Sequence, residues 1–438
     1  MSRQPPTPSR PAHGARHIAL HWGEALAAVL AGFLAMAVVA ALGLWAAGAA
    51  DLPGGFVNVV AAVMVMAAGG RIDLSGDAGA LAGTNADLTA MPLTVTLVGA
   101  LATGFCFLLP LRHHAVASTR DLLARAGRTV LLWLVGLACL SALAQHDFPV
   151  SIGGGESESE DTISDLFGEL LDAADPTVGF RTDLGATLGF GLLWILGVLL
   201  IALLVSRSPL PPRLVRHQEA VRPVAHTMLI LVLAYVVVGL VIGIVVATTR
   251  GHAAETWAVI LLGLPNVSWL ALGVGIGGSW EGTVEGPFGL PMPPILDAVL
   301  RTDTGGLSTV DLSSLTSYDS RAWWLLPVAA VLVLAVAFLA AVRSPARTRL
   351  WQHALRMAIA FGLTMLVITP VTLVEARFGL SILGIGELAS LGGQVVLRPA
   401  VWAMAGLGVL WGLVAGFLGG LLAKPVHRRG EVDEGRTD

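Results

Sequence analysis

The residues of this sequence that could do chemistry are few, and the most distinctive are two asparagines in apolar surroundings. Each precedes a pair of adjacent glycines by eleven and twelve residues, in VNVVAAVMVMAAGGR (57–71) and PNVSWLALGVGIGGS (265–279). An amide both donates and accepts hydrogen bonds, so in lipid it could pair with backbone groups or with a polar solute. The candidate functional or structural motif comprises Asn58, Gly69, Gly70, Pro265, Asn266, Trp269, Gly277 and Gly278.

Other patterns argue against enzyme chemistry. The G-x-G-x-G-G run at 273–278 neither follows a soluble strand nor opens a soluble helix, so it does not predict a dinucleotide site. Cys106 and Cys139 lie in apolar runs and are expected to be packing residues. The ESESED run at 156–161 reads as a solvated acidic loop. We therefore expect no catalytic residue, no cofactor and no metal.

The composition indicates a polytopic membrane protein. Hydrophobic residues make up 55% of the 438 residues and charged residues only 13%, against about 25% charged in ordinary soluble domains. The mean hydropathy is +0.78. The net charge of −4 leaves no basic surface for nucleic acid. The expected partners are membrane lipids, with another membrane protein as a candidate.

The apolar runs predict an all-α fold with eight transmembrane helices. The predicted spans are 25–48, 91–110, 129–144, 187–205, 224–247, 323–342, 354–374 and 399–422. Four arginines occur in each of the connections 112–128, 206–222 and 343–356, whereas the other connections hold most acids. Because bacterial cytoplasmic loops collect arginine and lysine, these three connections and both termini should be cytoplasmic, in a plasma membrane.

This charge map fixes the expected domains. They are a disordered cytoplasmic tail (1–24), a first membrane half (25–206), a cytoplasmic linker (207–223), a second membrane half (224–424) and a second cytoplasmic tail (425–438).

Two further apolar segments, 56–69 and 257–279, would place arginine-rich connections outside if they crossed the membrane. We therefore expect each to be re-entrant or half-inserted from the outer face. In the second, Pro265 should break the helix, Asn266 should pair with the freed backbone, and the glycines should allow close helix packing. The alternative is a tilted helix that Pro265 only kinks.

The two asparagine–glycine segments also suggest an internal repeat. The last span of each half contains G-x-G-x-L-W, and a basic residue, Arg207 or Lys424, follows Trp194 or Trp411 by thirteen positions. Four crossings per half would make the halves parallel. In the outer loops, 163–172 has the spacing of a helix with one acidic face, and 280–322 could cover the second re-entrant segment.

The segment LLGLPNVSWLALGVGIGGSWEG (261–282), with MPLTVTLVGAL (91–101) and the arginine-rich loops, resembles the streptophobe family. These are very hydrophobic, functionally uncharacterised membrane proteins of streptomycetes and their relatives. L-P-N-x-x-W at 264–269, before a glycine cluster and a proline-rich loop, is more distantly similar to actinobacterial PerM-type cell-division membrane proteins. Those carry G-P-G-F in the cluster, where this chain has residues 275–278 as GIGG.

Three functions are open at this point. The first is a non-enzymatic membrane scaffold or partner-binding protein of the cell envelope, because the apolar cores of the predicted spans hold no charged residue. The second is a facilitator or transporter of an uncharged or lipid-like solute, with Asn58 and Asn266 facing one cavity. The third is an enzyme that acts on lipid. It ranks last because the sequence shows no acid–base pair at membrane depth.

Overall fold

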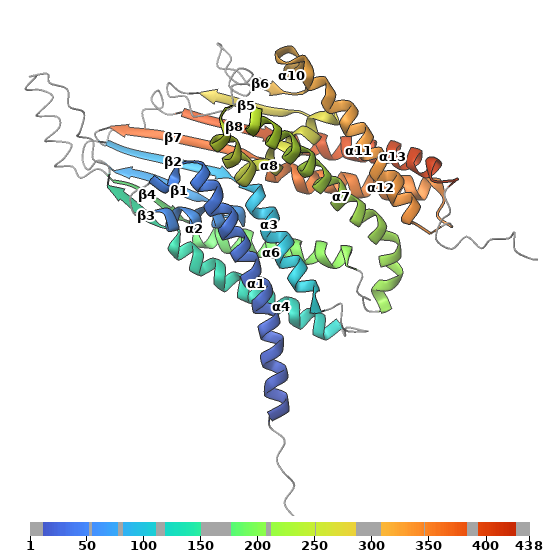
Figure 1. Cartoon of the computed structure of the whole chain (residues 1–438), viewed down its shortest axis with the longest axis horizontal. Coiled ribbons are helices and arrows are strands. Elements are labelled where there is room, and N and C mark those ends of the chain that lie inside the picture. The colour runs from blue at the N-terminus through green and yellow to red at the C-terminus, as the bar shows by residue number, and fades with distance from the viewer. Residues whose placement is uncertain are drawn as a thin grey trace, which may run out of the picture.

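A computed structural model gives the structure of the chain (Figure 1). The described residues are 12–51, 55–77, 82–110, 119–149, 177–206, 212–249, 251–285, 308–345, 347–382 and 393–425. The expected acidic helix at 163–172, the ESESED run and most of the proposed cover at 280–322 lie outside them.

Eight of the described helices are long and apolar enough to cross a membrane. They are α1 (Ala12–Ala46), α4 (Thr119–Leu143), α6 (Leu184–Val205), α7 (Pro212–Thr249), α8 (Ala253–Gly275), α11 (Leu325–Arg343), α12 (Leu350–Val371) and α13 (Val401–Leu422). The shorter helical elements are η1 (Ala49–Asp51), α2 (Phe56–Ala67), α3 (Leu93–Leu108), α10 (Leu312–Tyr318) and η3 (Ser320–Trp324). The chain is therefore a mainly helical, multi-pass integral membrane protein, as its hydropathy predicts.

The number of long apolar helices agrees with the prediction, but the membership differs. Helix α8 qualifies by length and composition, although we expected this segment not to cross. Helix α3, which we expected to cross, has 16 residues. At 1.5 Å per residue it is about 24 Å long, somewhat short of a bilayer core.

Two helices extend past the predicted domain boundaries. Helix α1 begins at Ala12, so residues 12–24, which we expected to be a disordered tail, are helical. The prolines of the N-terminus end at Pro11, and the residues after it can form a helix without interruption. Helix α7 begins at Pro212 and includes Pro223, so most of the predicted linker 207–223 is helical as well.

An eight-stranded antiparallel sheet is the part of the fold that the sequence did not reveal. Its strand order is β3-β4-β1-β2-β7-β8-β5-β6, and strand β2 joins the two halves by pairing with β7. The strands are β1 (Ile72–Asp77), β2 (Ala82–Ala90), β3 (His146–Pro149), β4 (Thr177–Thr182), β5 (Trp280–Glu285), β6 (Ser308–Val310), β7 (Val374–Ile382) and β8 (Gly393–Pro399). In Figure 1 the strands extend from one end of the helical bundle, and α1 runs away from them.

The same order of elements occurs twice along the chain. The first half runs α1-α2-β1-β2-α3-α4-β3-β4-α6, and the second runs α7-α8-β5-β6-α11-α12-β7-β8-α13, with α10 and η3 inserted before α11. The helix pairs that pack within the first half have counterparts in the second, for example α1 with α3 and α7 with α11. The strand order β3-β4-β1-β2 likewise recurs as β7-β8-β5-β6.

The strand registers and their charges also correspond. Ile72 pairs with Thr182 at the start of one ladder, and Trp280 pairs with Pro399 at the start of its counterpart. One residue further on, an acid faces an arginine in both ladders. These pairs are Asp73 with Arg181 and Glu281 with Arg398. Each arginine also lies near an acid of a third strand, at 4.0 Å for Arg181–Asp147 and 3.3 Å for Arg398–Glu375.

Each half has its own apolar core. In the first, Trp133 of α4 stacks between Phe33 and Trp194, with ring centroids 4.3 Å and 4.4 Å away. In the second, α13 packs tightly on α12 through glycines. A Cβ atom at Gly412 would lie 2.6 Å from the carbonyl oxygen of Met357. Small residues allow such close backbone contact in membranes, where packing replaces the hydrophobic effect between helices.

Candidate functional site

Helix α8 is continuous through Pro265, so the prediction that this proline breaks the helix is wrong. The hydroxyl group of Thr94, on the first turn of α3, lies within the α8 backbone ladder. It donates to the carbonyl oxygen of Ile260 (3.0 Å) and accepts from the N–H of Leu264 (3.1 Å). A side chain that enters a helix ladder in this way satisfies groups that a proline disturbs. Thr94 therefore provides the compensation that we had assigned to Asn266.

Asn266 bonds to a different helix. Its Nδ2 donates to the carbonyl oxygen of Met91 (2.9 Å), and its Oδ1 accepts from the N–H of Leu93 (3.2 Å). Leu93 is the first residue of α3, and the N-cap residue is Pro92, which makes no side-chain cap bond. Asn266 thus caps the start of α3 from outside, a position where orphan N–H groups require partners. Together, Asn266 and Thr94 fasten the second half to the first.

Asn58 has no comparable contact between the halves. Its Nδ2 donates to the carbonyl oxygens of Leu143 (2.8 Å) and Gln145 (3.2 Å), at the end of α4. The two asparagines therefore bond to different helix ends, and each has two backbone partners. Neither hydrogen-bonding pattern points to a shared cavity.

The glycine pairs have one conformation in both segments. Gly69 and Gly277 have φ values of +91° and +92°, a region that favours glycine. The next glycine donates its N–H to the carbonyl five residues back, Gly70 to Val65 and Gly278 to Gly273, both at 2.9 Å. This is the Schellman arrangement that ends a helix. In each segment it turns the chain directly into a strand, β1 after α2 and β5 after α8.

Some of the glycines also serve close packing, as expected. A Cβ at Gly275 would lie 2.7 Å from the carbonyl oxygen of Leu325, whereas Gly277 has nothing within 4 Å. Trp269 is 9% exposed, and its Nε1 donates to the carbonyl oxygen of Val232 on α7 (3.3 Å). Asn266 and Trp269 therefore join α8 to its neighbouring helices.

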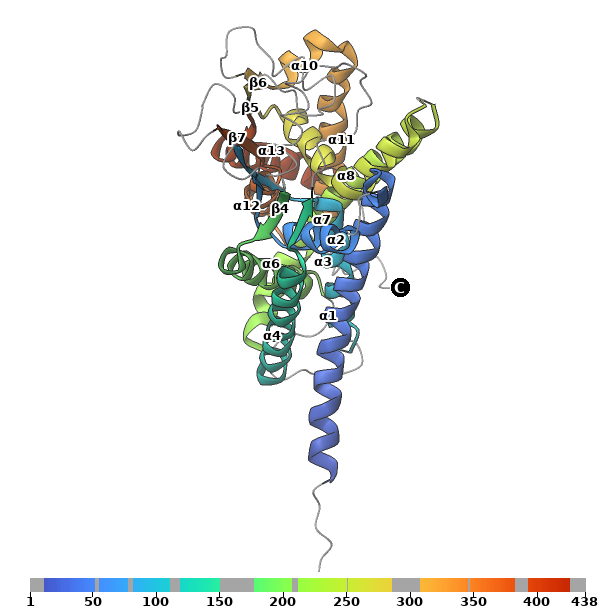
Figure 2. The ribbon, with the colours of Figure 1, turned by 90° about the vertical axis from the view of Figure 1, so that its left-hand side faces the viewer.

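Helices α2 and α8 both form hydrogen bonds with neighbouring helices. Thr96 of α3 donates to Ala67 at the end of α2 (2.8 Å), and Asn58 reaches the end of α4. Trp411 of α13 donates to Ile276 at the end of α8 (2.9 Å), and Asn266 reaches the start of α3. In Figure 2, α2 runs across the axis of α1, near the end of α1 that adjoins the sheet.

The sheet presents apolar residues to the helices and charges to the other face. Trp280 and Val310 are 1% and 0% exposed and pack with Met404 of α13. On the opposite face Asp73, Glu281 and Arg398 are exposed. Glu375 lies on β7 and contacts Arg398. Glu375 and Arg377 are two positions apart, which is the period at which side chains of a strand share a face. This spacing is a signal that could have identified β7.

Among the described residues, no group of three or more His, Cys, Asp or Glu side chains could hold a metal ion. Cys106 and Cys139 form no disulfide. Comparison with family models, with curated proteins and with solved structures returned no match. The site must therefore be interpreted from its own geometry.

Proposed function

We propose that this integral membrane protein is a non-enzymatic scaffold of the bacterial cell envelope whose eight-stranded sheet binds a partner protein. The observation that carries the proposal is the sheet itself. Its strands lead into or out of the helices of both halves, and its charged face points away from them. Such a surface is held in place by most of the membrane domain.

Strand connectivity supports a specific topology. Along the sequence, three helices, α6, α7 and α8, connect β4 to β5, and these two strands belong to the same sheet. A chain that returns to the same side of a membrane crosses it an even number of times, so one of the three helices does not cross. We assign that role to α8, which is the most buried of the eight long apolar helices, and likewise to α2, whose 12 residues are too few to span a bilayer core. Both termini then lie opposite the sheet.

The arginine-rich connections support the orientation. Their described parts, 119–128, 212–222, 343–345 and 347–356, lie at the ends of helices far from the strands. The positive-inside rule therefore assigns the sheet to the outer side of a bacterial cytoplasmic membrane. The recurring element order and strand registers support duplication of an ancestral half, with the two halves parallel. Membership of the streptophobe family, and the more distant relation to PerM-type proteins, are proposed on the sequence resemblance alone.

The scaffold explains the polar groups better than transport does. The side-chain amides of Asn58 and Asn266 bond to backbone at helix ends, which leaves the facilitator hypothesis without a specific observation in its favour. Arg181, Asp147 and Arg398 are exposed and take part in cross-strand ion pairs, which contribute little stability at a surface. Exposed, ordered charges of this kind suit recognition of a partner.

Site-specific photocrosslinking in intact cells of the native host tests this function. A photoreactive residue at Asp73 or Glu281, on the charged face of the sheet, should form a discrete adduct with one protein that also co-purifies stoichiometrically in mild detergent. The same residue at Leu34 or Val331, which are 68% and 64% exposed on α1 and α11, should not. Absence of a protein adduct at both sheet positions, or equal adducts at all four, would reject the sheet as a docking surface.

A further inference from the structure

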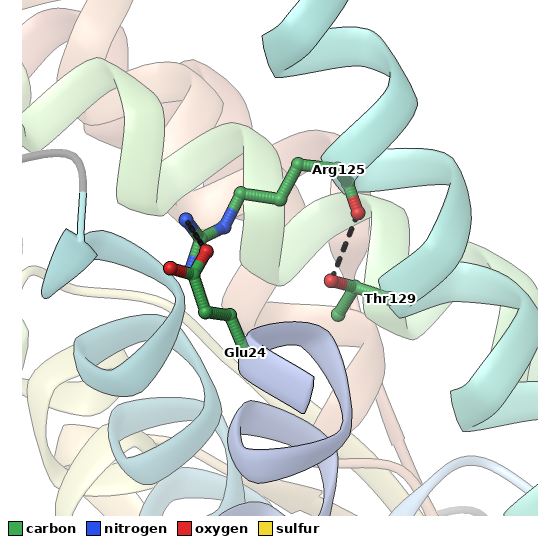
Figure 3. A network of polar contacts seen from close by, with 3 residues as sticks. All are labelled: Glu24, Arg125 and Thr129. Atoms are coloured by element: carbon green, nitrogen blue, oxygen red, sulfur yellow. Dashed lines mark hydrogen bonds and ion pairs between the residues drawn. The ribbon is translucent and has the colours of Figure 1, made fainter. Parts of the chain in front are cut away.

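A buried arginine lies at the end of α4 that is far from the sheet. The side chain of Arg125 is 9% exposed, and its Nη1 donates to Oε2 of Glu24 on α1 at 3.0 Å (Figure 3). The guanidinium carbon lies 5.2 Å from the ring centroid of Phe107, a fully buried residue of α3. Arg125 thus occupies the junction of three helices.

Three of the five N–H donors of the Arg125 guanidinium have no partner among the described residues. Its Nε and Nη2 are buried and have no hydrogen-bond partner within the described part of the chain. These two groups form one edge of the guanidinium plane, the fork that binds two oxygens of a carboxylate or phosphate. A buried charged donor without a partner is costly, so the fork favours an anionic occupant.

Arg125 also has a local excess of positive charge. Arg128, one turn further along α4, is close enough to oppose the charge of Arg125, and Glu24 is the opposing acid. Arg128 itself lies over the ring of Trp22, 6.0 Å from its centroid. A second anion beside Arg125 would balance this pair of cations.

The position of Arg125 along α4 corresponds to the headgroup level of a bilayer. From Arg125 to Leu143, at the sheet end, the helix rises about 27 Å at 1.5 Å per residue, close to the thickness of a hydrocarbon core. Apolar residues of the same helix, Leu123 and Leu131, are 64% and 52% exposed and would face lipid. The anion within reach at this depth is a lipid phosphate.

We propose that the Nε–Nη2 fork of Arg125 binds the phosphate of an anionic phospholipid in the leaflet opposite the sheet. The phosphate oxygens accept the two unpaired N–H groups, and Arg128 adds electrostatic attraction. Basic sites between transmembrane helices recognise anionic headgroups by this chemistry. The proposal depends on membrane insertion of the chain and is independent of any partner on the sheet.

Native mass spectrometry of the full-length protein in detergent, titrated with phosphatidylglycerol or phosphatidylcholine, tests this site. The wild-type protein should bind one phosphatidylglycerol at least about tenfold more tightly than phosphatidylcholine. Arg125→Lys keeps the charge but lacks the fork, so it should lose most of this preference. Arg343→Gln, which removes an arginine from the end of α11, is the matched control and should keep it.

A second variant, Glu24→Gln, distinguishes a lipid site from an arginine that serves only in a structural ion pair. Glu24→Gln should retain or increase the preference for phosphatidylglycerol, because it removes a competing negative charge and leaves the fork intact. Equal binding of the two lipids by wild type, or an undiminished preference in Arg125→Lys, would overturn the proposal. Displacement of the lipid by millimolar glycerol phosphate would instead show a site for soluble phosphate, which also contradicts it.

Discussion

Gly412→Ala should lower the free energy of unfolding by about 3 kcal/mol. The new Cβ would lie 2.6 Å from the carbonyl oxygen of Met357 and 2.8 Å from Cα of Ala358. Both atoms belong to the backbone of α12, which cannot move aside as a flexible side chain can. Helices α12 and α13 must therefore separate, and the core of the second half loosens with them.

Gly406→Ala, on the same helix, is the matched control. A Cβ at Gly406 has nothing within 4 Å, so alanine should be neutral or stabilise α13 by up to about 1 kcal/mol through helix propensity. Unfolding of the purified protein by titration with sodium dodecyl sulfate measures both variants. Similar effects at the two glycines would contradict the tight α12–α13 contact.

Asn266→Leu should lower the free energy of unfolding by about 2 kcal/mol. The substitution leaves the carbonyl oxygen of Met91 and the N–H of Leu93 without their side-chain partner. Both groups are part-buried, and each pays a desolvation penalty when unpaired. Because these bonds join the two halves, the loss should also appear as faster proteolysis between them.

Asn58→Leu provides the comparison, since Asn58 has the corresponding position in the first segment. Its bonds to Leu143 and Gln145 are exposed, so water can replace the amide and the cost should stay below about 1 kcal/mol. A larger loss at Asn58 than at Asn266, in the same detergent titration, would show that the contact between the halves does not depend on Asn266.

The hydrophobic spans could be predicted because lipid imposes a long apolar run on every crossing helix. Runs such as 224–247 and 399–422 correspond closely to α7 and α13. The assignment of 257–279 depended on charge placement, and the structure adds an independent constraint through the position of β5 in the sheet. Length and composition alone would have counted α8 as a span and omitted α3.

The sheet could not be predicted in the same way. Its strands include IDLSGD and AGTNADLTA, which contain Gly, Asp and Asn, residues of low strand propensity. The central ladder pairs Leu88 with Ala376, residues far apart in the sequence, and no local pattern reports such a pairing. Only the two-residue spacing of the charged residues Glu375 and Arg377 gave a local indication of a strand.

The contacts of the candidate motif could not be foreseen from the sequence. The matching spacing before the glycine pairs corresponds to the same helix end in both segments, with φ values near +90° at Gly69 and Gly277. The partners of Asn266 lie on α3, which no spacing within the segment could indicate. The role of Thr94 depends on the contact between α3 and α8, which no local pattern in the sequence indicates.

Labelling of single cysteines in intact cells with a membrane-impermeant thiol reagent tests the topology most directly. The native Cys106 and Cys139 are first replaced by alanine. Cysteines at Thr309, in the sheet, and at His252, between α7 and α8, should both be labelled, whereas one at Arg349, before α12, should react only after cell lysis. Protection of His252 with labelling of Thr309 would mean that α8 crosses the membrane, and labelling of Arg349 in intact cells would reverse the orientation.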